Sequence, residues 1–307
     1  MHQPVLLSEV VGDLVVKPGG CYLDGTLGGA GHARALLERA GPAARLLGLD
    51  RDGVALELAT RNLVGWSGQI TLVRGNFADM KELAGQHGFA GFDGILLDLG
   101  VSSMQLDTPE RGFSFQHDAE LDMRMDTRAG PTAADLVNTM GESDLADLIW
   151  KLGEDRDARR IARQLVAARD RAPLRRTGEL ADLVDRAKGG RRGRIHPATQ
   201  TFQALRMAVN RELESVEQGL AAALELLVPG GRLGVISFHS LEDRLVKQTL
   251  VAHVAREESL PQGGVRRVVK APEVRWVVRK PVVAGEDELA RNPRARSAKW
   301  RVVERTD

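Results

Sequence analysis

The sequence predicts an α/β fold in which a parallel, doubly wound sheet carries a helical insertion. Short apolar or β-branched runs recur at residues 21–24, 46–50, 70–73, 94–98 and 232–238, and helix-length stretches such as 32–40 separate the first of them. Strands that alternate with helices form parallel sheets. More than 130 residues then separate Asp98 from Phe238. One crossover needs far fewer residues, so a second domain is expected between the fourth and fifth strands.

The expected insertion is predicted to be helical. Thr132 and Asp135 have the spacing of a capping box, and residues 143–150 and 157–171 continue with helical periodicity. Apolar residues over 202–227 recur every three or four positions, which predicts one long helix that ends at the Pro-Gly-Gly sequence of 229–231. The expected domains are a first part of the sheet domain at 1–106, an inserted helical substrate-recognition domain at 107–210 and a second part of the sheet domain at 211–307.

The composition limits the classes of protein that need considering. The 307 residues suffice for a sheet domain with an insertion. There is no run of about eighteen apolar residues and no signal-like N-terminus, so a cytoplasmic protein without a membrane partner is expected. Cys21 is the single cysteine, which excludes an intrachain disulfide and a cysteine-based zinc site. The seven histidines show no metal-ligand spacing, so no metal is expected.

The charge is unevenly distributed along the chain. The net charge is +1, yet residues 151–210 carry +8 and residues 264–307 carry +6. Two basic segments on an otherwise acidic protein favour binding of a polyanion, with nucleic acid favoured over a membrane surface. The flexible stretch with Arg191, Arg192 and Arg194 is the candidate phosphate contact. A solvated basic surface without a partner is the alternative.

A glycine-rich turn, Asp24-Gly-Thr-Leu-Gly-Gly-Ala-Gly-His32, follows the first predicted strand, and the second predicted strand ends at Asp50. Glycines let the backbone approach a ligand, and the next helix presents free N–H groups to it. An acid one βαβ step downstream suits ribose hydroxyls and would repel a 2′-phosphate. The pattern favours an adenosine cofactor, either NAD or S-adenosylmethionine. The third glycine typical of dinucleotide folds is missing, which weighs against NAD.

Further candidate residues follow the fourth and fifth predicted strands. Asp98 ends the fourth strand and is followed by Ser102 and Gln105, whereas Phe238 and His239 end the fifth. Ligands of open α/β sheets bind outside the carboxyl ends of the strands, so these side chains are expected to face cofactor and substrate. A helix or turn cap is the alternative role for the aspartate.

Two more candidates lie near the expected cofactor. Phe77 follows the third strand, where an aromatic ring can cover an adenine, although a core position is an equal alternative. His32 begins the helix after the glycine turn and is either a cofactor contact or a capping residue.

Two more apolar runs, at 274–278 and 300–303, raise the predicted strands to seven. Seven strands with a late hairpin are typical of S-adenosylmethionine-dependent methyltransferases. The chain resembles the MraW, or RsmH, family of small-subunit ribosomal RNA cytosine-N4 methyltransferases over nearly its whole length. The motifs that carry the resemblance are Asp24-Gly-Thr-Leu-Gly-Gly-Ala-Gly-His32, Gly94-Ile-Leu-Leu-Asp-Leu-Gly-Val-Ser-Ser103, Glu110-Arg-Gly-Phe-Ser-Phe115, Leu121-Asp-Met-Arg-Met-Asp126, His196-Pro-Ala-Thr-Gln-Thr-Phe-Gln-Ala-Leu-Arg206, Ile236-Ser-Phe-His-Ser-Leu-Glu-Asp-Arg244 and Asn292-Pro-Arg-Ala-Arg-Ser297.

The resemblance implies a Rossmann-like class I methyltransferase sheet and methylation of the exocyclic N4 of a cytidine in the decoding region of 16S rRNA, expected at position 1402. Its partner would be small-subunit rRNA within an assembled or nearly assembled subunit, and a homodimer is left open. The implied catalytic residues are Asp98, Ser102 and Phe238. The implied contacts to S-adenosylmethionine are Ala30, Gly31, His32, Asp50, Phe77, Asp98 and Gln105.

The base pocket is less well defined by the sequence than the cofactor pocket. The chain lacks the Asp-Pro-Pro-Tyr sequence with which many amino-methyltransferases hold the target nitrogen. Phe113, Phe115 or Phe238 could stack on a cytosine that has left its helix. Two other functions stay open at this point. They are an NAD-dependent oxidoreductase on the same fold and a non-catalytic protein of RNA binding or ribosome assembly.

Overall fold

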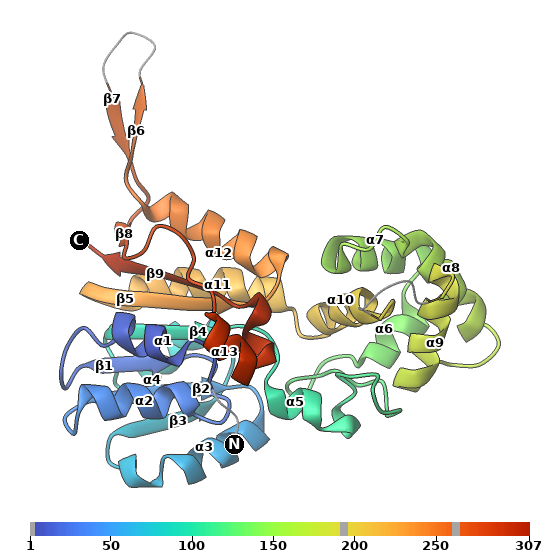
Figure 1. Cartoon of the computed structure of the whole chain (residues 1–307), viewed down its shortest axis with the longest axis horizontal. Helices are drawn as coiled ribbons and strands as arrows, with labels where there is room; N and C mark the ends of the chain where they lie inside the picture. Colours follow the sequence, from blue (N-terminus) through green and yellow to red (C-terminus); the bar gives the residue numbers. More distant parts are fainter. Residues whose placement is uncertain (1–3, 191–195, 260–264) are drawn as a thin grey trace. The chain divides into compact units, whose positions relative to one another are not determined.

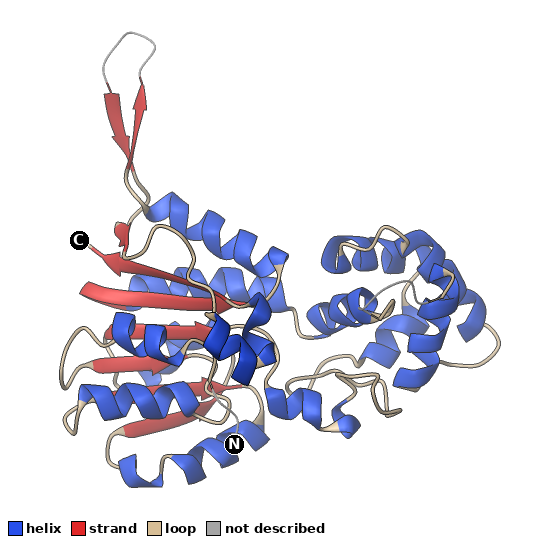
Figure 2. Ribbon diagram, in the orientation of Figure 1, coloured by secondary structure: helices blue, strands red, loops and turns tan. Residues whose placement is uncertain are grey.

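The computed structural model describes residues 4–190, 196–259 and 265–307. A seven-stranded sheet has the order β3-β2-β1-β4-β5-β9-β8 (Figures 1 and 2). Strands β1 to β5 are parallel to one another, whereas β9 is antiparallel to both β5 and β8. The strands are β1 (Cys21–Asp24), β2 (Arg45–Asp50), β3 (Ile70–Arg74), β4 (Phe92–Asp98), β5 (Leu227–Ser237), β8 (Val274–Trp276) and β9 (Lys299–Arg305).

The predicted seven-stranded α/β sheet is confirmed. All five strands of the parallel part lie where the apolar runs predicted them, and the runs at 274–278 and 300–303 contain β8 and β9. Strands β2 and β4 are buried on both sides, which is why they are continuous apolar runs in the sequence rather than alternating ones, whereas the edge strand β3 is half-buried.

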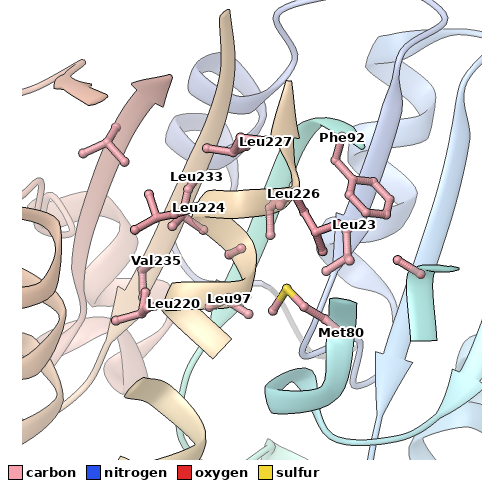
Figure 3. Close-up of a cluster of buried hydrophobic side chains, with 14 of the residues drawn as sticks. Leu23, Met80, Phe92, Leu97, Leu220, Leu224, Leu226, Leu227, Leu233 and Val235 are labelled. Atoms are coloured by element: carbon pink, nitrogen blue, oxygen red, sulfur yellow. The ribbon is translucent and has the colours of Figure 1, made fainter. Parts of the chain in front are cut away.

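Helices cover both faces of the sheet, and alternate strand residues enter the two sides. Leu23 and Leu97 point into the cluster that contains Met80 and Leu220 (Figure 3). Tyr22 and the strand residues that alternate with Leu23 and Leu97 belong to other hydrophobic clusters. These clusters also contain residues from the helices on the opposite face of the sheet. One face carries α1 (Leu7–Leu14), α2 (Gly31–Ala40) and α3 (Gly53–Asn62), and the other carries α4 (Met80–Gln86), α11 (Glu212–Leu226) and α12 (Ser240–His253).

The chain divides into two compact units. The sheet unit consists of Met1–Gly100 and Leu213–Asp307, and the helical unit is Val101–Glu212. The helical unit has a core of its own, built from residues such as Val137, Ile149 and Ile161. Its helices are α5 (Ser103–Asp107), α6 (Ala133–Thr139), α7 (Glu142–Gly153), α8 (Ala158–Arg169), α9 (Thr177–Lys188) and α10 (Thr199–Val209).

The predicted start of α6 is confirmed in detail. The Thr132 hydroxyl accepts a hydrogen bond from the Asp135 N–H at 3.1 Å, and the Asp135 carboxylate accepts one from the Thr132 N–H at 2.8 Å. This reciprocal pair satisfies backbone donors that a helix start otherwise leaves open.

The predicted single helix over 202–227 is wrong. Helix α10 ends at Val209 and α11 begins at Glu212, because Arg211 has a left-handed φ of 49°. The Asn210 side chain takes part in this break, since it accepts from the Met125 N–H at 2.7 Å and donates to the Met123 carbonyl at 2.7 Å. The apolar spacing continues across the break, so periodicity alone could not detect it. The Pro-Gly-Gly sequence of 229–231 lies within β5, three residues after α11 ends at Leu226.

Several elements of the sheet unit were not predicted, among them a pair of strands and a short helix near the C-terminus. Strands β6 (Arg256–Ser259) and β7 (Val265–Val268) form a separate antiparallel pair, and α13 (Glu286–Arg291) precedes β9. Within the described ranges, no helix has the length and apolar character needed to cross a membrane.

Candidate cofactor site

Three aspartates end neighbouring parallel strands. Asp24 ends β1, Asp50 ends β2 and Asp98 ends β4, and β1 pairs with both of the other strands. The carboxyl ends of open α/β sheets are where ligands bind. The structure therefore brings together the two predicted acids and a third, Asp24. Sequence reasoning treated Asp24 only as the start of the glycine turn, although its place at a strand end is the same as that of the other two.

The carboxylates of this edge hold the glycine-rich turn. The Gly28 N–H donates to Oδ2 of Asp50 at 2.8 Å, and the Asp52 N–H donates to its Oδ1 at 2.8 Å. The Thr26 N–H donates to Oδ1 of Asp24 at 3.1 Å. Each carboxylate oxygen can accept more than one hydrogen bond, so Asp50 can also bind ribose hydroxyls.

The glycines of the turn serve different purposes. A Cβ at Gly25 would lie 2.7 Å from a methyl group of Leu97, and one at Gly31 would lie 2.4 Å from Cγ of Pro4. These two glycines are therefore required by packing within the protein. Gly28 has a left-handed φ of 50° and no side chain within contact distance of its Cβ position. It is the glycine that leaves room beside the turn.

The start of α2 leaves its first backbone amides without a side-chain cap. Ala30 occupies the N-cap position with a left-handed φ of 62°, and alanine has no acceptor group. Helix N-termini of this kind attract ligand acceptor groups through the backbone N–H groups. Ala30 and Gly31 are thus positioned for the backbone contacts that the sequence predicted, which stay a prediction.

His32 is buried and lies between a backbone carbonyl and Asp98. Its Nε2 is 2.8 Å from the Val5 carbonyl oxygen, and its Nδ1 is 3.6 Å from Oδ2 of Asp98. Burial lowers the pKa of the imidazole, and the charge of Asp24 partly offsets this effect. His32 is not the N-cap of α2, so the capping alternative is wrong.

Burial raises the pKa of all three acids of this edge, although backbone N–H groups donate to Asp24 and Asp50. Burial raises the pKa of Asp24 to about 6, partly offset by His32. Burial raises the pKa of Asp98 to about 7, and the nearby charge of Glu242 adds to the increase. Burial also raises the pKa of Asp50, against the hydrogen bonds that it accepts. Among the described residues, Oδ1 of Asp98 has no hydrogen-bond partner.

Two phenylalanines of the sheet unit lie near this edge. Phe77 begins a short 3-10 helix after β3, and its half-buried ring packs so closely on α11 that a Cβ at Gly219 would lie 2.4 Å from it. Phe238 follows β5, and its N–H donates to Glu242 at 2.9 Å. Its ring lies 3.7 Å from the Cβ position of Gly100, two residues after Asp98.

Other predicted site residues belong to the helical unit. The Ser102 hydroxyl accepts from the Gln105 N–H at 3.2 Å, and the Gln105 carbonyl oxygen accepts from the Ser102 N–H at 3.0 Å. Both side chains therefore cap α5, and their approach to the cofactor stays a prediction.

The structure describes the aromatic candidates of the helical unit but not its basic candidates. Phe113 is buried, and the ring centroid of Phe115 lies 4.6 Å from that of His196 and 4.8 Å from that of Phe202, so both phenylalanines belong to the core. The predicted phosphate contacts Arg191, Arg192 and Arg194 lie outside the described residues.

The residues of the sheet edge fit S-adenosylmethionine better than NAD. S-adenosylmethionine brings a sulfonium, an ammonium and a ribose to an edge that offers three carboxyl groups and an unpaired acceptor, Oδ1 of Asp98. The pyrophosphate of NAD would place two negative charges beside the same acids. The sheet and this edge thus define a methyltransferase of the S-adenosylmethionine-dependent class.

Comparison with known proteins identifies the family. A family model described as "MraW methylase family" matches residues 1–306, and the chain belongs to this family. It is 53% identical to "Ribosomal RNA small subunit methyltransferase H" of Geobacter sulfurreducens over 307 residues, covering 99% of this chain and 98% of that protein. A protein with the same name from Syntrophotalea carbinolica is 51% identical over 306 residues, with the same coverage.

Among solved structures, an rRNA methylase from Streptococcus thermophilus gives a TM-score of 0.44 at 8% identity, covering 100% of this chain and 99% of that one. This similarity is too weak to bear on function. Family membership confirms the resemblance found in the sequence and makes S-adenosylmethionine the cofactor of this methyltransferase.

Proposed function

We propose that this methyltransferase acts on the exocyclic N4 of a cytidine in the decoding region of small-subunit rRNA, within an assembled or nearly assembled subunit. Relatives about half identical over 99% of the chain are named as rRNA small subunit methyltransferases. The observation that carries the proposal is Asp98. Its carboxyl group ends β4 at the cofactor edge, and the unpaired Oδ1 suits an N–H donor from an amino group.

The proposed chemistry depends on positioning and on hydrogen-bond acceptors. The N4 lone pair of cytosine is delocalised into the ring, so the nitrogen is a poor nucleophile. When bound, S-adenosylmethionine supplies the electrophilic methyl group. Asp98 and the Gly100 carbonyl accept the N–H groups of the amino nitrogen and favour its pyramidal form, and alignment of the nitrogen with the methyl group supplies much of the acceleration.

The base must leave its helix to reach the end of β4. Phe238 is the proposed stacking residue, because its half-buried ring lies beside Gly100 at the end of the neighbouring strand. The rings of Phe113 and Phe115 are instead packed in the core of the helical unit. Ser102 fixes the backbone that follows Gly100 through its capping box with Gln105, which is the role that we propose for it in the reaction.

The helical unit is the proposed rRNA-binding part. Arg156, Arg159, Arg160 and Arg163 are exposed, and their spacing of three, four and seven residues places them along one face of α8 and its start. Arg163 has a loose ion pair with Glu142 at 3.8 Å, and within the described ranges the other three form no ion pair. Such a face suits RNA phosphates, together with Arg191, Arg192 and Arg194.

The test is incubation with labelled S-adenosylmethionine and small ribosomal subunits that lack their native methylation, followed by nucleoside analysis of the digested rRNA. Label in N4-methylcytidine is the expected result, and mapping of the labelled nucleotide checks the expected position. Protein-free rRNA is the parallel substrate that tests the need for an assembled subunit. Label in another nucleoside would contradict the proposal. No label with intact cofactor binding would favour the non-catalytic assembly function.

A further inference from the structure

The hydrogen positions of His32 are fixed by a backbone carbonyl. A carbonyl oxygen only accepts hydrogen bonds, so the 2.8 Å contact to Val5 requires a hydrogen on Nε2. In the neutral ring, Nδ1 then carries a lone pair. This lone pair faces Oδ2 of Asp98 at 3.6 Å, slightly beyond hydrogen-bond distance. Two acceptors therefore face each other unless a proton lies between them.

Burial favours the state in which the two groups share one proton. The side chain of His32 is 7% exposed and that of Asp98 is 26% exposed, and burial lowers the pKa of the His32 ring. Burial raises the pKa of Asp98 to about 7. A protonated carboxyl beside a neutral ring puts no net charge into this interior, whereas an ionised carboxyl beside a neutral ring puts in a negative charge.

The charges around the pair act in the same direction. The charged groups that act on the two side chains from neighbouring elements are acidic, and a histidine lies beside one of them. An acidic surrounding disfavours a further negative charge on Asp98 and favours retention of a proton. These groups are Asp24 of β1, Glu242 of α12, Glu288 of α13 and His239, which lies 3.1 Å from Glu242.

We propose that His32 and Asp98 share one proton in the ligand-free protein, lose it when the positively charged sulfonium binds, and take up one proton when methyl transfer removes that charge. The last step rests on the proposed function, since the amino nitrogen is the source of the proton. Asp98 is the group that touches the reactants, and His32 is a positioning residue that acts through it.

The step balances in atoms and charge. The bond between the amino nitrogen and the methyl carbon forms as the sulfur–carbon bond breaks, and the electron pair of that bond stays on sulfur. The nitrogen then gives one proton to Asp98, whose carboxyl group is held by Nδ1 of His32. Sulfur changes from positive to neutral while Asp98 changes from negative to neutral. The buried edge therefore keeps the same net charge, which avoids the cost of an unpaired charge in a medium of low dielectric constant.

The experiment compares two ligands that differ in the charge on sulfur. Calorimetric titrations of the full protein at pH 7 with S-adenosylmethionine or S-adenosylhomocysteine, in buffers of different ionisation enthalpy, give the number of protons released on binding. Because burial raises the pKa of Asp98 to about 7, we expect S-adenosylmethionine to release about half a proton more at pH 7 than S-adenosylhomocysteine. Equal release for the two ligands in the wild-type protein would overturn the proposal without the need for any variant.

Variants separate the roles of the two residues. Asp98→Asn should abolish the difference between the ligands. His32→Gln keeps a donor for the Val5 carbonyl but has no titrating ring, so the neutral carboxyl loses its acceptor. For His32→Gln, we expect the difference in proton release between the two ligands at pH 7 to fall at least two-fold. The pH at which this difference is largest should move below 7. A His32→Gln protein that matches the wild type would remove His32 from the proposal.

His253 provides the matched control. It is also buried, and its Nδ1 lies 2.9 Å from the Pro272 carbonyl oxygen, but within the described ranges no hydrogen bond or ion pair joins it to a residue of the cofactor edge. His253→Asn should leave the proton release unchanged. The titrations contain no RNA, so their failure would leave the proposed substrate standing. Conversely, nucleoside analysis that finds a different product would leave the measured proton release unaffected.

Discussion

The two units of the protein handle charge in opposite ways. The sheet unit holds buried or half-buried acids at the strand ends, and backbone N–H groups donate to two of them, as Gly28 does to Asp50. The helical unit exposes its arginines along α8 and leaves most of them without an ion pair within the described ranges. Buried charges act strongly on reacting atoms that are held near them, whereas exposed arginines can bind a phosphate backbone of varying shape. The proposed chemistry and the proposed RNA recognition therefore place different demands on the two units.

The largest expected effect tests the buried side of this comparison. Asp98→Asn should lower the rate of methyl transfer by about 10³-fold, because the amide cannot take the proton from the amino nitrogen. Single-turnover transfer to unmethylated subunits measures this rate, and rRNA affinity should change less than about two-fold. The exposed Asp79 of the sheet unit is the control, since Asp79→Asn should leave the rate unchanged. A ten-fold effect or less would mean that Asp98 serves the cofactor alone.

The second effect concerns the stability of the ligand-free protein. Asp24 and Asp98 have pKa values of about 6 and about 7, both above the ordinary value of 3.8. A carboxyl group whose pKa is higher in the folded protein than in the unfolded chain stabilises the fold fully below pH 4. This stabilisation is lost as the pH rises through the folded-state pKa values of about 6 and about 7. The free energy of unfolding should therefore fall by a few kcal/mol between pH 5 and pH 8.

Urea unfolding at a series of pH values measures this loss, with the sheet unit followed separately because the two units need not unfold together. Asp98→Asn should flatten the upper part of the curve. Asp118→Asn is the control in the helical unit, because hydrogen bonds from Gly178 and Arg176 lower the pKa of Asp118 out of this pH range. A stability that stays constant from pH 5 to pH 8 would contradict the assignment of raised pKa values.

The third effect separates packing from ligand contact in the glycine turn. Gly31→Ala should cost about 1–3 kcal/mol of stability, because the new methyl group meets Pro4 at 2.4 Å. Gly12→Ala in α1 is the control, since its Cβ position is open, and it should stabilise the protein by up to about 1 kcal/mol. Unfolding experiments on both variants measure the difference. Equal stabilities would show that Pro4 moves aside without cost.

The smallest effect tests the exposed side of the comparison. Neutralising Arg159 and Arg160 together, as Arg159→Gln and Arg160→Gln, should weaken rRNA binding about ten-fold and reduce the salt dependence by about 1.4 in the logarithmic slope. Affinity for S-adenosylmethionine should not change. The control carries Arg175→Gln and Arg186→Gln, two exposed arginines of the helical unit that lie outside α8. If both double variants lose affinity equally, then total charge rather than the α8 face determines binding.

The sequence predicted the sheet well because several of its strands, such as β2 and β4, are buried on both sides. Such strands appear as continuous apolar runs, and the turn after β1 and the acid at Asp50 follow from their places at strand ends. The interruption between α10 and α11 was not predictable in the same way. It depends on the side chain of Asn210, which bonds to residues 85 and 87 positions earlier in the chain. Local patterns carry no information about such contacts.

The candidate site shows the same difference between local patterns, which the sequence reveals, and contacts between distant residues, which it does not. The family motif places Asp98 and His32 in one site, but the sequence could not assign their hydrogen-bond partners. The Val5 carbonyl has no side-chain signature, and the reason for glycine at position 31 is contact with Pro4 rather than with a ligand. Conversely, the structure assigns Ser102 and Gln105 a capping role that their motif position did not reveal.

The segment before α1 has a consequence for gene annotation and for protein production. Pro4 packs on Gly31, the Val5 carbonyl anchors His32, and the Leu6 N–H donates to Glu288 of α13 at 2.8 Å. A translation start chosen a few codons downstream would retain every strand and helix of the sheet. The resulting protein would nonetheless lack the carbonyl that orients His32, so an inactive recombinant preparation could have its cause in the chosen start codon.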